Sequence, residues 1–353
     1  MSTVPLPDDL RAALATRLHS TAPKRASAQV ERLIENYRGQ TPTTAPVLRD
    51  ADDVAAYAAY RMPATYAAVR TALHSLRDQA PEWTPGVHLD LGGGTGAATW
   101  AVADAWPSGE AAGGTASPHV STVLDWSRAA LALGAELARD AREPAVRDAR
   151  WTLAPLGGTP RLPEADLVTV SYVLGELAPA DREALLAATA EAARGAVLIA
   201  EPGTPDGYAR IIAARDLLIA AGFRILAPCP HDGPCPVTGR DWCHFAARVQ
   251  RTSLHRQVKG GSLPYEDEKF SYLAAARFPA RPARSRVVRH PQIRKGLVML
   301  DLCTRDGGLV RSNVTKRQGE LYRAARDTDW GDPWPPEAEP PEAEPPEADQ
   351  SQP

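Results

Sequence analysis

Four cysteines are the residues of this chain best suited to bind a metal. Cys229, Cys235 and Cys243 lie in the fifteen-residue segment CPHDGPCPVTGRDWC, and Cys303 follows in VMLDLC. Three thiolates from one proline-rich loop and a fourth from a distant segment would form a four-thiolate site for zinc or for an iron–sulfur cluster. Zinc sites more often contain C-x-x-C pairs, which this chain lacks. The spacing therefore leaves both metals open, and four unrelated free thiols are the alternative.

The segment LDLGGGTGAATWAVADAW has the residue types of a cofactor-binding turn. Asp90 precedes glycines at every second position, Gly92, Gly94 and Gly96, and an alanine-rich helix follows directly. Such glycines let the backbone turn tightly and approach a ligand, and the N-terminus of the helix offers free N–H groups. The spacing differs from the G-x-G-x-x-G fingerprint of dinucleotide sites. It resembles motif I of class I S-adenosylmethionine-dependent methyltransferases.

That resemblance implies roles for the residues of the turn and for one later acid. Asp90 and the turn, which also contains Gly93 and Thr95, would hold the methionine part of S-adenosylmethionine. Asp125 ends the next apolar run in TVLDWS and would bond the ribose hydroxyls, as the acid after the second strand does in dinucleotide sites. A related fold that no longer binds a cofactor is the alternative.

The elements that must position these residues alternate in type. Short runs rich in Val, Leu and Ile, each followed by a segment that suits a helix, predict a mainly parallel sheet covered on both faces. Before residue 85 the apolar spacing is helical, and Pro63 is expected to break or kink the second helix there. The predicted strands are 86–92, 120–125, 165–174, 195–203 and the run GFRILAPCP, and the predicted helices between them are 95–105, 127–140, 180–194 and 207–221.

We therefore predict an α/β fold of the class I methyltransferase, Rossmann-like type, with N-terminal helices and a basic C-terminal extension that contains the cysteines. The predicted regions are a helical region at 1–84, an S-adenosylmethionine-binding core at 85–228, a cysteine-cluster and basic region at 229–330 and an acidic Pro/Glu/Ala tail at 331–353. The repeat PPEAE in that tail has little to bury, so we expect it to be disordered.

Catalytic residues are not identified by the sequence. The segment SYVLGEL at 171–177 occupies the position where base-amino methyltransferases carry an Asn-Pro-Pro-Tyr type motif, and that motif is absent. No cysteine lies there for a covalent mechanism. Tyr172 and Glu176 are candidate substrate contacts, although Glu176 is better suited to begin or cap the next helix. The sequence thus supports cofactor binding more strongly than it supports methyl transfer.

Charge is distributed unevenly along the chain. From Arg240 to Arg326 there are 19 basic and 7 acidic residues, a net charge of +12, whereas Asp327 to the end contains nine acidic residues and no basic ones. A basic block of this size suggests a polyanionic partner such as RNA, with a solvated basic surface as the alternative. Within the block, we interpret Glu266, Asp267 and Glu268 as internal partners of nearby Arg and Lys.

No membrane partner is expected. No stretch approaches the roughly 18 uninterrupted apolar residues of a membrane span, and the first thirty residues lack the apolar centre of a signal peptide. Asp8 and Asp9 do not suit an organelle-targeting peptide. We therefore expect a cytoplasmic protein, in which structural disulfides would be unusual.

Four longer segments carry a more specific resemblance. RMPATYAAV, APCPHDGPCP, DWCHFAARVQR and LHRQVKGGSLPYEDEKFSYL together resemble the methyltransferase-like proteins of the mitochondrial small ribosomal subunit and their bacterial relatives, over residues 30–325. The resemblance implies a [4Fe-4S] cluster bound by Cys229, Cys235, Cys243 and Cys303, with zinc as the alternative. It also implies action in assembly of the small ribosomal subunit through contact with its RNA.

Two functions follow from these patterns. The first is an S-adenosylmethionine-binding, iron–sulfur protein that acts in small-subunit assembly and methylates ribosomal RNA. The second is an assembly factor without methyl transfer that uses the fold as an RNA-binding platform and the cluster as a sensor of iron or redox state. A small-molecule methyltransferase is disfavoured by the basic block. The candidate phosphate contacts are Arg256, Lys259, Lys269, Arg289, Arg294 and Lys295.

Overall fold

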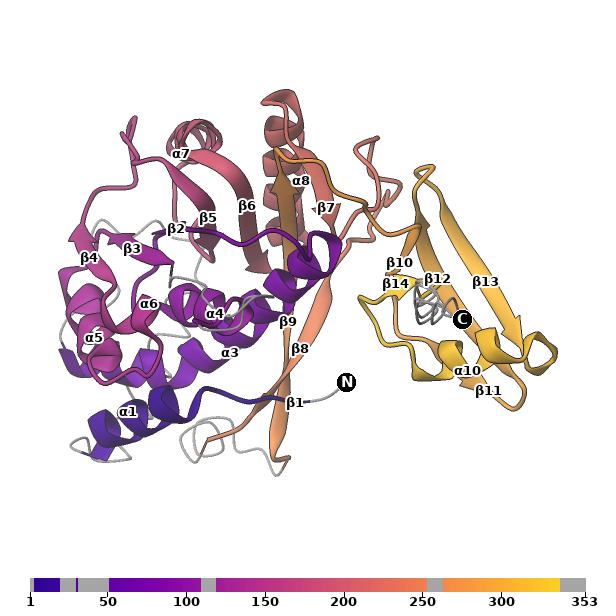
Figure 1. Cartoon of the computed structure of the whole chain (residues 1–353), viewed down its shortest axis with the longest axis horizontal. Coiled ribbons are helices and arrows are strands. Elements are labelled where there is room, and N and C mark those ends of the chain that lie inside the picture. The colour runs from indigo at the N-terminus through magenta and orange to yellow at the C-terminus, as the bar shows by residue number, and fades with distance from the viewer. Residues whose placement is uncertain (1–2, 20–29, 31–50, 109–118, 253–262, 337–353) are drawn as a thin grey trace, which may run out of the picture.

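The protein consists of a large sheet covered by helices and a smaller sheet beside it (Figure 1). The computed structural model describes residues 3–19, 30, 51–108, 119–252 and 263–336. The acidic repeat of the predicted tail therefore lies outside the described residues, and so do Arg256 and Lys259.

The larger sheet has nine strands within the described residues, in the order β1-β8-β9-β6-β5-β2-β3-β4, with β7 paired to β9. Five neighbouring strands from β4 to β6 are parallel, and β9 runs antiparallel to β6, β7 and β8. The strands are β1 (Thr3–Val4), β2 (Val87–Leu91), β3 (Val120–Asp125), β4 (Arg150–Leu153), β5 (Ala165–Ser171), β6 (Ala193–Pro202), β7 (Arg224–Ala227), β8 (Phe245–Gln250) and β9 (Tyr265–Ala276).

This strand order confirms the predicted fold class. Chain order reverses between β2 and β5, because β3 and β4 extend the sheet on one side of β2 whereas β5 and β6 extend it on the other. Ligands of open α/β sheets bind at such a switch point, beyond the carboxyl ends of the strands. With β9 inserted antiparallel between β6 and β7, the arrangement is the class I methyltransferase fold.

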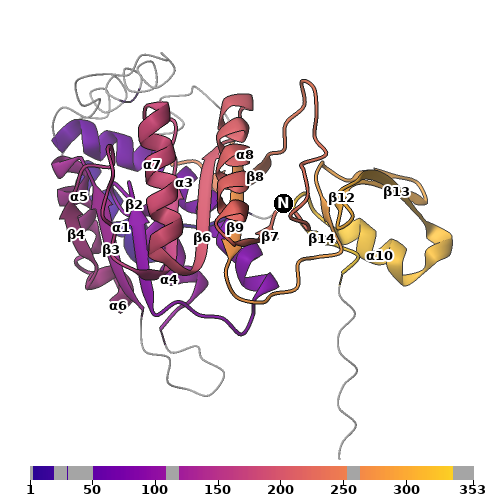
Figure 2. The same cartoon turned by 90° about the horizontal axis from the view of Figure 1, so that it is seen from above.

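Helices cover both faces of the larger sheet (Figures 1 and 2). One face packs against α1, α3, α4 and α5, whose buried residues form a continuous apolar core with β6 and β9. The other face packs against α7 and α8. The helices are α1 (Asp8–His19), α3 (Ala51–Gln79), α4 (Ala97–Ala105), α5 (Arg128–Ala138), α6 (Pro144–Arg147), α7 (Pro179–Ala192) and α8 (Pro205–Ala220).

Two local predictions were wrong or incomplete. Helix α3 is not broken at Pro63, which lies inside its 29 residues. Proline removes one backbone hydrogen bond, but buried neighbours such as Met62, Tyr66 and Val69 hold the helix against the sheet on both sides of it. Strand β4 was not predicted because it is an edge strand whose residues are mostly exposed, so it lacks an apolar run.

A second, five-stranded sheet follows β9 and has its own small apolar core, which includes Val298, Leu300 and Val314. The region 229–330 is thus divided between the two sheets, since β8 and β9 complete the larger one. The elements of the second part are β10 (Ser285–Val287), β11 (Gln292–Arg294), β12 (Leu297–Thr304), β13 (Leu309–Thr315), the 3-10 helix Lys316–Gln318, α10 (Glu320–Asp327) and β14 (Pro333–Trp334).

Across the described ranges, no helix combines the length and the hydrophobicity that are needed to cross a lipid bilayer.

Candidate cofactor pocket and cysteine site

A cavity of about 400 Å³ lies at the switch point between β2 and β5, beyond the carboxyl ends of β2, β3 and β5. Its volume is in the range of small-molecule sites. The glycine turn forms one wall, the ends of β3 and β5 form others, and α3 closes the cavity. The lining residues include Tyr57, Arg61, Met62, Thr65, Gly92, Gly93, Gly94, Thr95, Asp125, Trp126, Ser127, Ser171, Tyr172, Glu176 and Asp181.

The glycine turn can be formed only with small residues at key positions. Gly92 has a φ of 66°, and a Cβ atom there would lie 2.0 Å from Val173 Cγ2. Gly94 has a φ of 53° and faces open space, with Asp125 Oδ2 at 3.8 Å as the nearest atom to an added Cβ. Gly96, the N-cap residue of α4, has no side chain that could cap the helix. The turn therefore presents backbone and uncapped helix N–H groups, which favour an anionic group such as a carboxylate.

The two predicted acids take different places around this turn. Asp125 lines the cavity, and its carboxylate accepts hydrogen bonds from the N–H groups of Gly94 (2.9 Å) and Ser127 (2.6 Å). Asp90 is fully buried behind the turn and accepts hydrogen bonds from the hydroxyls of Thr169 (2.9 Å) and Thr99 (3.2 Å). Asp90 does not line the cavity, so the geometry offers it a supporting role in place of the direct ligand contact that we expected.

Burial also changes the acidity of Asp90. Removal of its carboxyl group from water raises the pKa to about 6, although the hydrogen bonds from Thr169 and Thr99 oppose that shift. Burial likewise raises the pKa of Asp125, against the hydrogen bonds from the backbone of Ser127 and Gly94. Asp125 is thus held in part by the turn itself, through Gly94, whereas Asp90 is held by hydroxyls of β5 and α4.

On the other side of the cavity, three side chains from distant segments form a rigid group that we did not predict. Arg61 of α3 donates two hydrogen bonds to Glu268 of β9, at 3.0 and 2.9 Å. The hydroxyl of Tyr172 donates to Glu268 Oε1 at 3.1 Å, and the Arg61 guanidinium lies 5.1 Å from the centre of the Tyr172 ring. Tyr172 has a φ of 60°, a costly conformation for a non-glycine residue that is common at functional sites.

Glu176 is the one acidic residue of SYVLGEL, and its carboxyl group is suited to proton transfer. Glu176 is exposed and lines the cavity, where its carboxyl group is partly removed from water. This desolvation, with Asp125 and Glu201 as neighbouring negative charges, raises the pKa to about 7. A carboxyl group with a pKa close to neutral is suited to accept a proton from a substrate.

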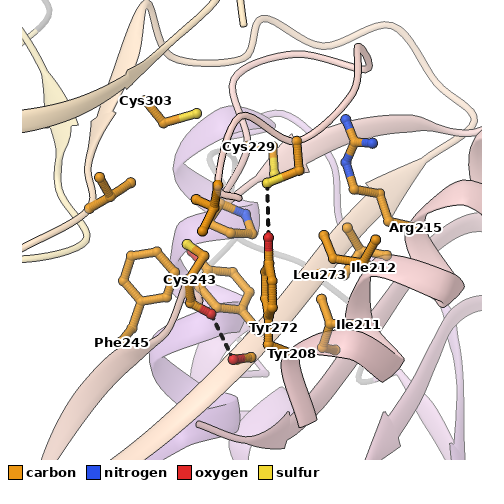
Figure 3. Close-up of a pocket in the computed structure, with 15 residues that line it drawn as sticks. Tyr208, Ile211, Ile212, Arg215, Cys229, Cys243, Phe245, Tyr272, Leu273 and Cys303 are labelled. Atoms are coloured by element: carbon orange, nitrogen blue, oxygen red, sulfur yellow. Dashed lines mark hydrogen bonds between the residues drawn. The ribbon is translucent and has the colours of Figure 1, made fainter. Parts of the chain in front are cut away.

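The four cysteines line a second, smaller cavity of about 30 Å³ between the two sheets (Figure 3). Cys229, Cys235 and Cys243 come from the loop after β7, and Cys303 comes from β12. The rest of the lining is largely apolar and comes from α8 and β9, with residues such as Ile211, Tyr272 and Leu273. The structure thus brings together all four residues that were predicted to bind a metal.

The thiols interact with one another and with polar neighbours. The Cys235 thiol lies 3.1 Å from the Tyr208 hydroxyl, and Cys303 Sγ lies 3.5 Å from His231 Nε2. Burial raises the pKa of Cys229 to about 11 and that of Cys303 to about 12, and nearby thiols add to both shifts. Negative charge on one thiol therefore disfavours negative charge on the others unless a cation is bound between them.

The chemistry of this donor set fits a thiolate-bound metal group, but the conformation does not present a finished site. Within the described ranges, no group of three or more His, Cys, Asp or Glu side chains could hold a metal ion as it stands. The four thiols would have to turn toward one point or around a larger group. Metal binding would also remove their protons, which links metal affinity to pH.

The predicted nucleic-acid residues lie on both sheets. Lys269 is exposed on β9, whereas Arg294 and Lys295 are exposed where β11 turns into β12. Arg289 is only partly exposed and pairs with Asp241 at 2.5 Å. The interpretation of the acidic cluster holds for Glu266 and Asp267, which form ion pairs with the nearby Arg251 and Arg248, whereas Glu268 pairs with the distant Arg61.

Comparisons with known proteins show which family and which relatives this chain is similar to in sequence. The family described as "Mitochondrial small ribosomal subunit Rsm22" matches residues 51–335. The human "Ribosome assembly protein METTL17, mitochondrial" is 29% identical over 294 residues, which cover 78% of this chain and 61% of the relative. The "Rsm22-cox11 tandem protein 2, mitochondrial" of Schizosaccharomyces pombe is 27% identical over 184 residues, which cover 40% of this chain and 24% of that protein. The chain thus spans less than two thirds of the length of these relatives.

Solved structures of methyltransferases show a more distant similarity. Magnesium protoporphyrin IX methyltransferase (ChlM) from Synechocystis, with bound SAM, has a TM-score of 0.38 and 12% identity, and the match covers 78% of this chain and all of that one. The glycopeptide N-methyltransferase MtfA has a TM-score of 0.37 and 14% identity, over 59% of this chain and 89% of that one.

Replacement of Asp90 by asparagine should remove one component of the pH dependence of stability. The unfolded chain loses the Asp90 proton near its ordinary pKa of 3.8, but the folded protein loses it near 6. The protonated Asp90 carboxyl group therefore favours the folded protein at low pH, and this contribution to stability is lost as the pH rises from 3.8 to about 6. We expect the difference in unfolding free energy between Asp90→Asn and the wild type to change by about 3 kcal/mol across it, as measured by urea unfolding.

The matched control is Asp148→Asn, because the Asp148 side chain is 69% exposed. Its unfolding free energy should follow the wild-type pH dependence. An Asp90→Asn variant that also follows the wild-type curve would show that the buried carboxyl is not destabilised when it is ionised.

Proposed function

The chain belongs to the mitochondrial small ribosomal subunit Rsm22 family, and we propose that it binds S-adenosylmethionine and a metal group and acts in assembly of the small ribosomal subunit. The name of the human relative, a ribosome assembly protein, supports the process. The observation that carries the cofactor part is the cavity at the switch point, in which the glycine turn and Asp125 face the same volume.

The residues around this cavity fit the parts of S-adenosylmethionine. Asp125 can accept hydrogen bonds from the ribose hydroxyls, and the side chain of Trp126, which is 58% exposed, offers a flat apolar surface to the adenine ring. The uncapped N-terminus of α4 suits the carboxylate of the methionine part. Gly94 keeps the wall open where a side chain would intrude.

Methyl transfer to ribosomal RNA is the activity that we propose for this site. The bound cofactor supplies an electrophilic methyl group, and the protein contributes mainly proximity and orientation of the acceptor. The ion pair between Arg61 and Glu268 fixes the Tyr172 ring as a wall of the acceptor side. Glu176 is placed to accept the proton that the acceptor releases.

We propose further that Cys229, Cys235, Cys243 and Cys303 hold a [4Fe-4S] cluster, with zinc as the alternative ligand group. The support is that all four cysteines of the chain line one cavity, although they come from two distant segments. A bound metal group would link the loop after β7 to β12 and so fasten the second sheet to the larger one. Its binding energy would then contribute to folding.

Ribosomal RNA is the proposed partner of the second sheet. Exposed basic residues are spread over β11, β13, α10, the segments that connect them and the segment before β10, at positions that suit contacts with phosphates. They are Arg281, Arg284, Arg294, Lys295, Arg305, Arg311, Lys316, Arg317, Arg323 and Arg326.

An assembly factor without methyl transfer is the second candidate function. The absence of an Asn-Pro-Pro-Tyr type motif at 171–177 favours it, because nothing in SYVLGEL replaces the group that grips an exocyclic amine. In that case maturation would not depend on the cofactor, and the fold would serve as a platform for RNA.

The substitution Gly94→Ala tests the cofactor site and separates the two functions. The added methyl group would project into the cavity near Asp125 Oδ2, so we expect S-adenosylmethionine affinity to fall at least tenfold in calorimetric titration. Loss of both methyl transfer and small-subunit maturation in cells would support the enzyme. Maturation that survives the loss of binding would support the assembly factor.

Gly239→Ala is the matched control for this test. Gly239 also has a positive φ, 73°, but an added Cβ there has no atom within 4 Å. Both variants should therefore lose a similar amount of stability, about 1–2 kcal/mol, from the backbone conformation alone. Unchanged affinity in Gly94→Ala would contradict the proposed placement of the cofactor.

Anaerobic purification tests the metal proposal. We expect about four irons and four acid-labile sulfides per chain, with a broad absorption band near 400 nm, and we expect both to be lost in Cys303→Ser. Stoichiometric zinc without sulfide would replace the cluster by a zinc site. A wild-type protein without any metal would contradict the proposal.

Loss of two positive charges at the β11–β12 turn should weaken RNA binding. For the double variant Arg294→Gln, Lys295→Gln, we expect lower affinity for a small-subunit RNA fragment and a shallower salt dependence, by about one phosphate contact per residue. Arg139→Gln, Arg142→Gln removes the same charge from exposed positions at the end of α5 and should leave both quantities unchanged. Equal losses in the two double variants would indicate only a general charge effect.

A further inference from the structure

Two arginines lie almost completely buried beside the cysteine cavity. Arg215 and Arg286 are each 2% exposed and are among the largest fully buried side chains of the described chain. Arg215 comes from α8 and lines the cavity (Figure 3). Arg286 lies on β10 directly opposite Cys303 in the β10–β12 ladder. Both cations are thus close to thiols that were expected to bind a metal.

The hydrogen bonds of these arginines go to neutral groups. Arg215 donates to the carbonyl oxygens of His231 (3.0 Å) and Gly233 (2.6 Å). Arg286 donates to the carbonyl oxygens of Pro228 (3.1 Å) and Gly331 (2.9 Å). These bonds hold the cysteine loop in place, but they do not neutralise the positive charges.

Each guanidinium also retains an unsatisfied donor. Within the described chain, Arg215 Nε and Arg286 NH2 are buried and have no hydrogen-bond partner. The carboxylates nearby offer weak compensation. Asp216 lies 3.5 Å from Arg215, but its side chain is 69% exposed. Asp332 interacts electrostatically with Arg286, but its hydrogen bond is to the N–H of Asp329, and burial opposes the charged form of its carboxyl group.

Such an arrangement is costly unless negative charge lies nearby. A guanidinium group stays protonated in proteins, and an uncompensated buried charge costs several kcal/mol. The geometry places thiols beside both cations, since Arg215 lines the cavity together with all four cysteines and Arg286 lies opposite Cys303. Neutral thiols supply no negative charge, whereas thiolates do.

We infer that Arg215 and Arg286 are the buried counter-charges of a dianionic centre, in which four thiolates surround a metal group that carries two positive charges. This inference rests on the proposed metal function of the four cysteines. A zinc ion and the core of an oxidised four-iron cluster both carry two positive charges, so four thiolates around either leave a charge of minus two. Two arginines balance that charge, and they act as positioning residues and not as ligands.

A double-mutant cycle tests the inference in the full-length chain. Arg286→Met removes the charge and keeps a long side chain, and Arg286→Lys keeps the charge. Both are made in the wild type and in a variant with all four cysteines replaced by serine. In the metal-loaded wild type, we expect Arg286→Met to lose metal to a chelator at least tenfold faster, whereas Arg286→Lys should retain most of it.

The thermal midpoint separates a charge role from a structural one. If Arg286 only holds Pro228 and Gly331, Arg286→Met should lower the midpoint equally in both backgrounds. If it balances a dianionic centre, the loss should be larger in the metal-loaded background. For an iron–sulfur cluster, Arg286→Met should also shift the reduction potential to a lower value, because less positive charge then stabilises the added electron.

Arg150→Met is the control, since Arg150 is exposed on the edge strand β4 and belongs to neither proposed site. Arg215→Met repeats the test from the α8 side if Arg286→Met fails to fold. Metal-loaded variants that match the wild type in metal retention, potential and midpoint would overturn the inference while leaving the proposed metal site intact. A wild-type chain that binds no metal would instead overturn the proposed metal site, and the inference with it.

Discussion

The backbone pairing of β9 is the constraint on which both sites depend. This strand runs antiparallel to β6, β7 and β8, so it completes the larger sheet and leads the chain to the second one. Near its start, Glu268 joins Arg61 and Tyr172 at the wall of the cofactor cavity. A few residues later, Tyr272 and Leu273 line the cysteine cavity. Because the register of β9 sets both placements, a slip of one residue would exchange its two faces and disrupt both sites.

The two cavities differ in how their buried charges are compensated. Around the cofactor cavity two of the buried charges have partners: Asp90 accepts two hydroxyl hydrogen bonds, and Arg61 pairs with Glu268. Beside the cysteines, Arg215 and Arg286 donate to carbonyl oxygens and each retains a buried donor without a partner. The first cavity is thus stable as a preformed site, whereas the electrostatics of the second are best satisfied by an anionic centre.

The uncompensated charge beside the cysteines suggests how the second sheet is held in place. Its apolar core is small, and Arg286 and Cys303, which connect it to the cysteine loop, lie opposite each other on neighbouring strands. A metal group between the sheets would therefore stabilise the position of the basic surface relative to the cofactor cavity. In the proposed function, this coupling would present ribosomal RNA to the rest of the protein only when the metal is bound.

The sequence alone determined the strand–helix alternation, the glycine turn, the position of Asp125 and the set of four cysteines, because these features depend on local spacing and on residue types with few other uses. It did not determine that Asp90 lies behind the turn, that Pro63 is accommodated within α3, or that Arg61 and Glu268 meet across 207 residues of sequence. It also could not distinguish Arg215 and Arg286 from the solvated arginines around them. Those outcomes depend on which faces of distant elements are packed together, and burial and charge compensation exist only once the tertiary structure has formed.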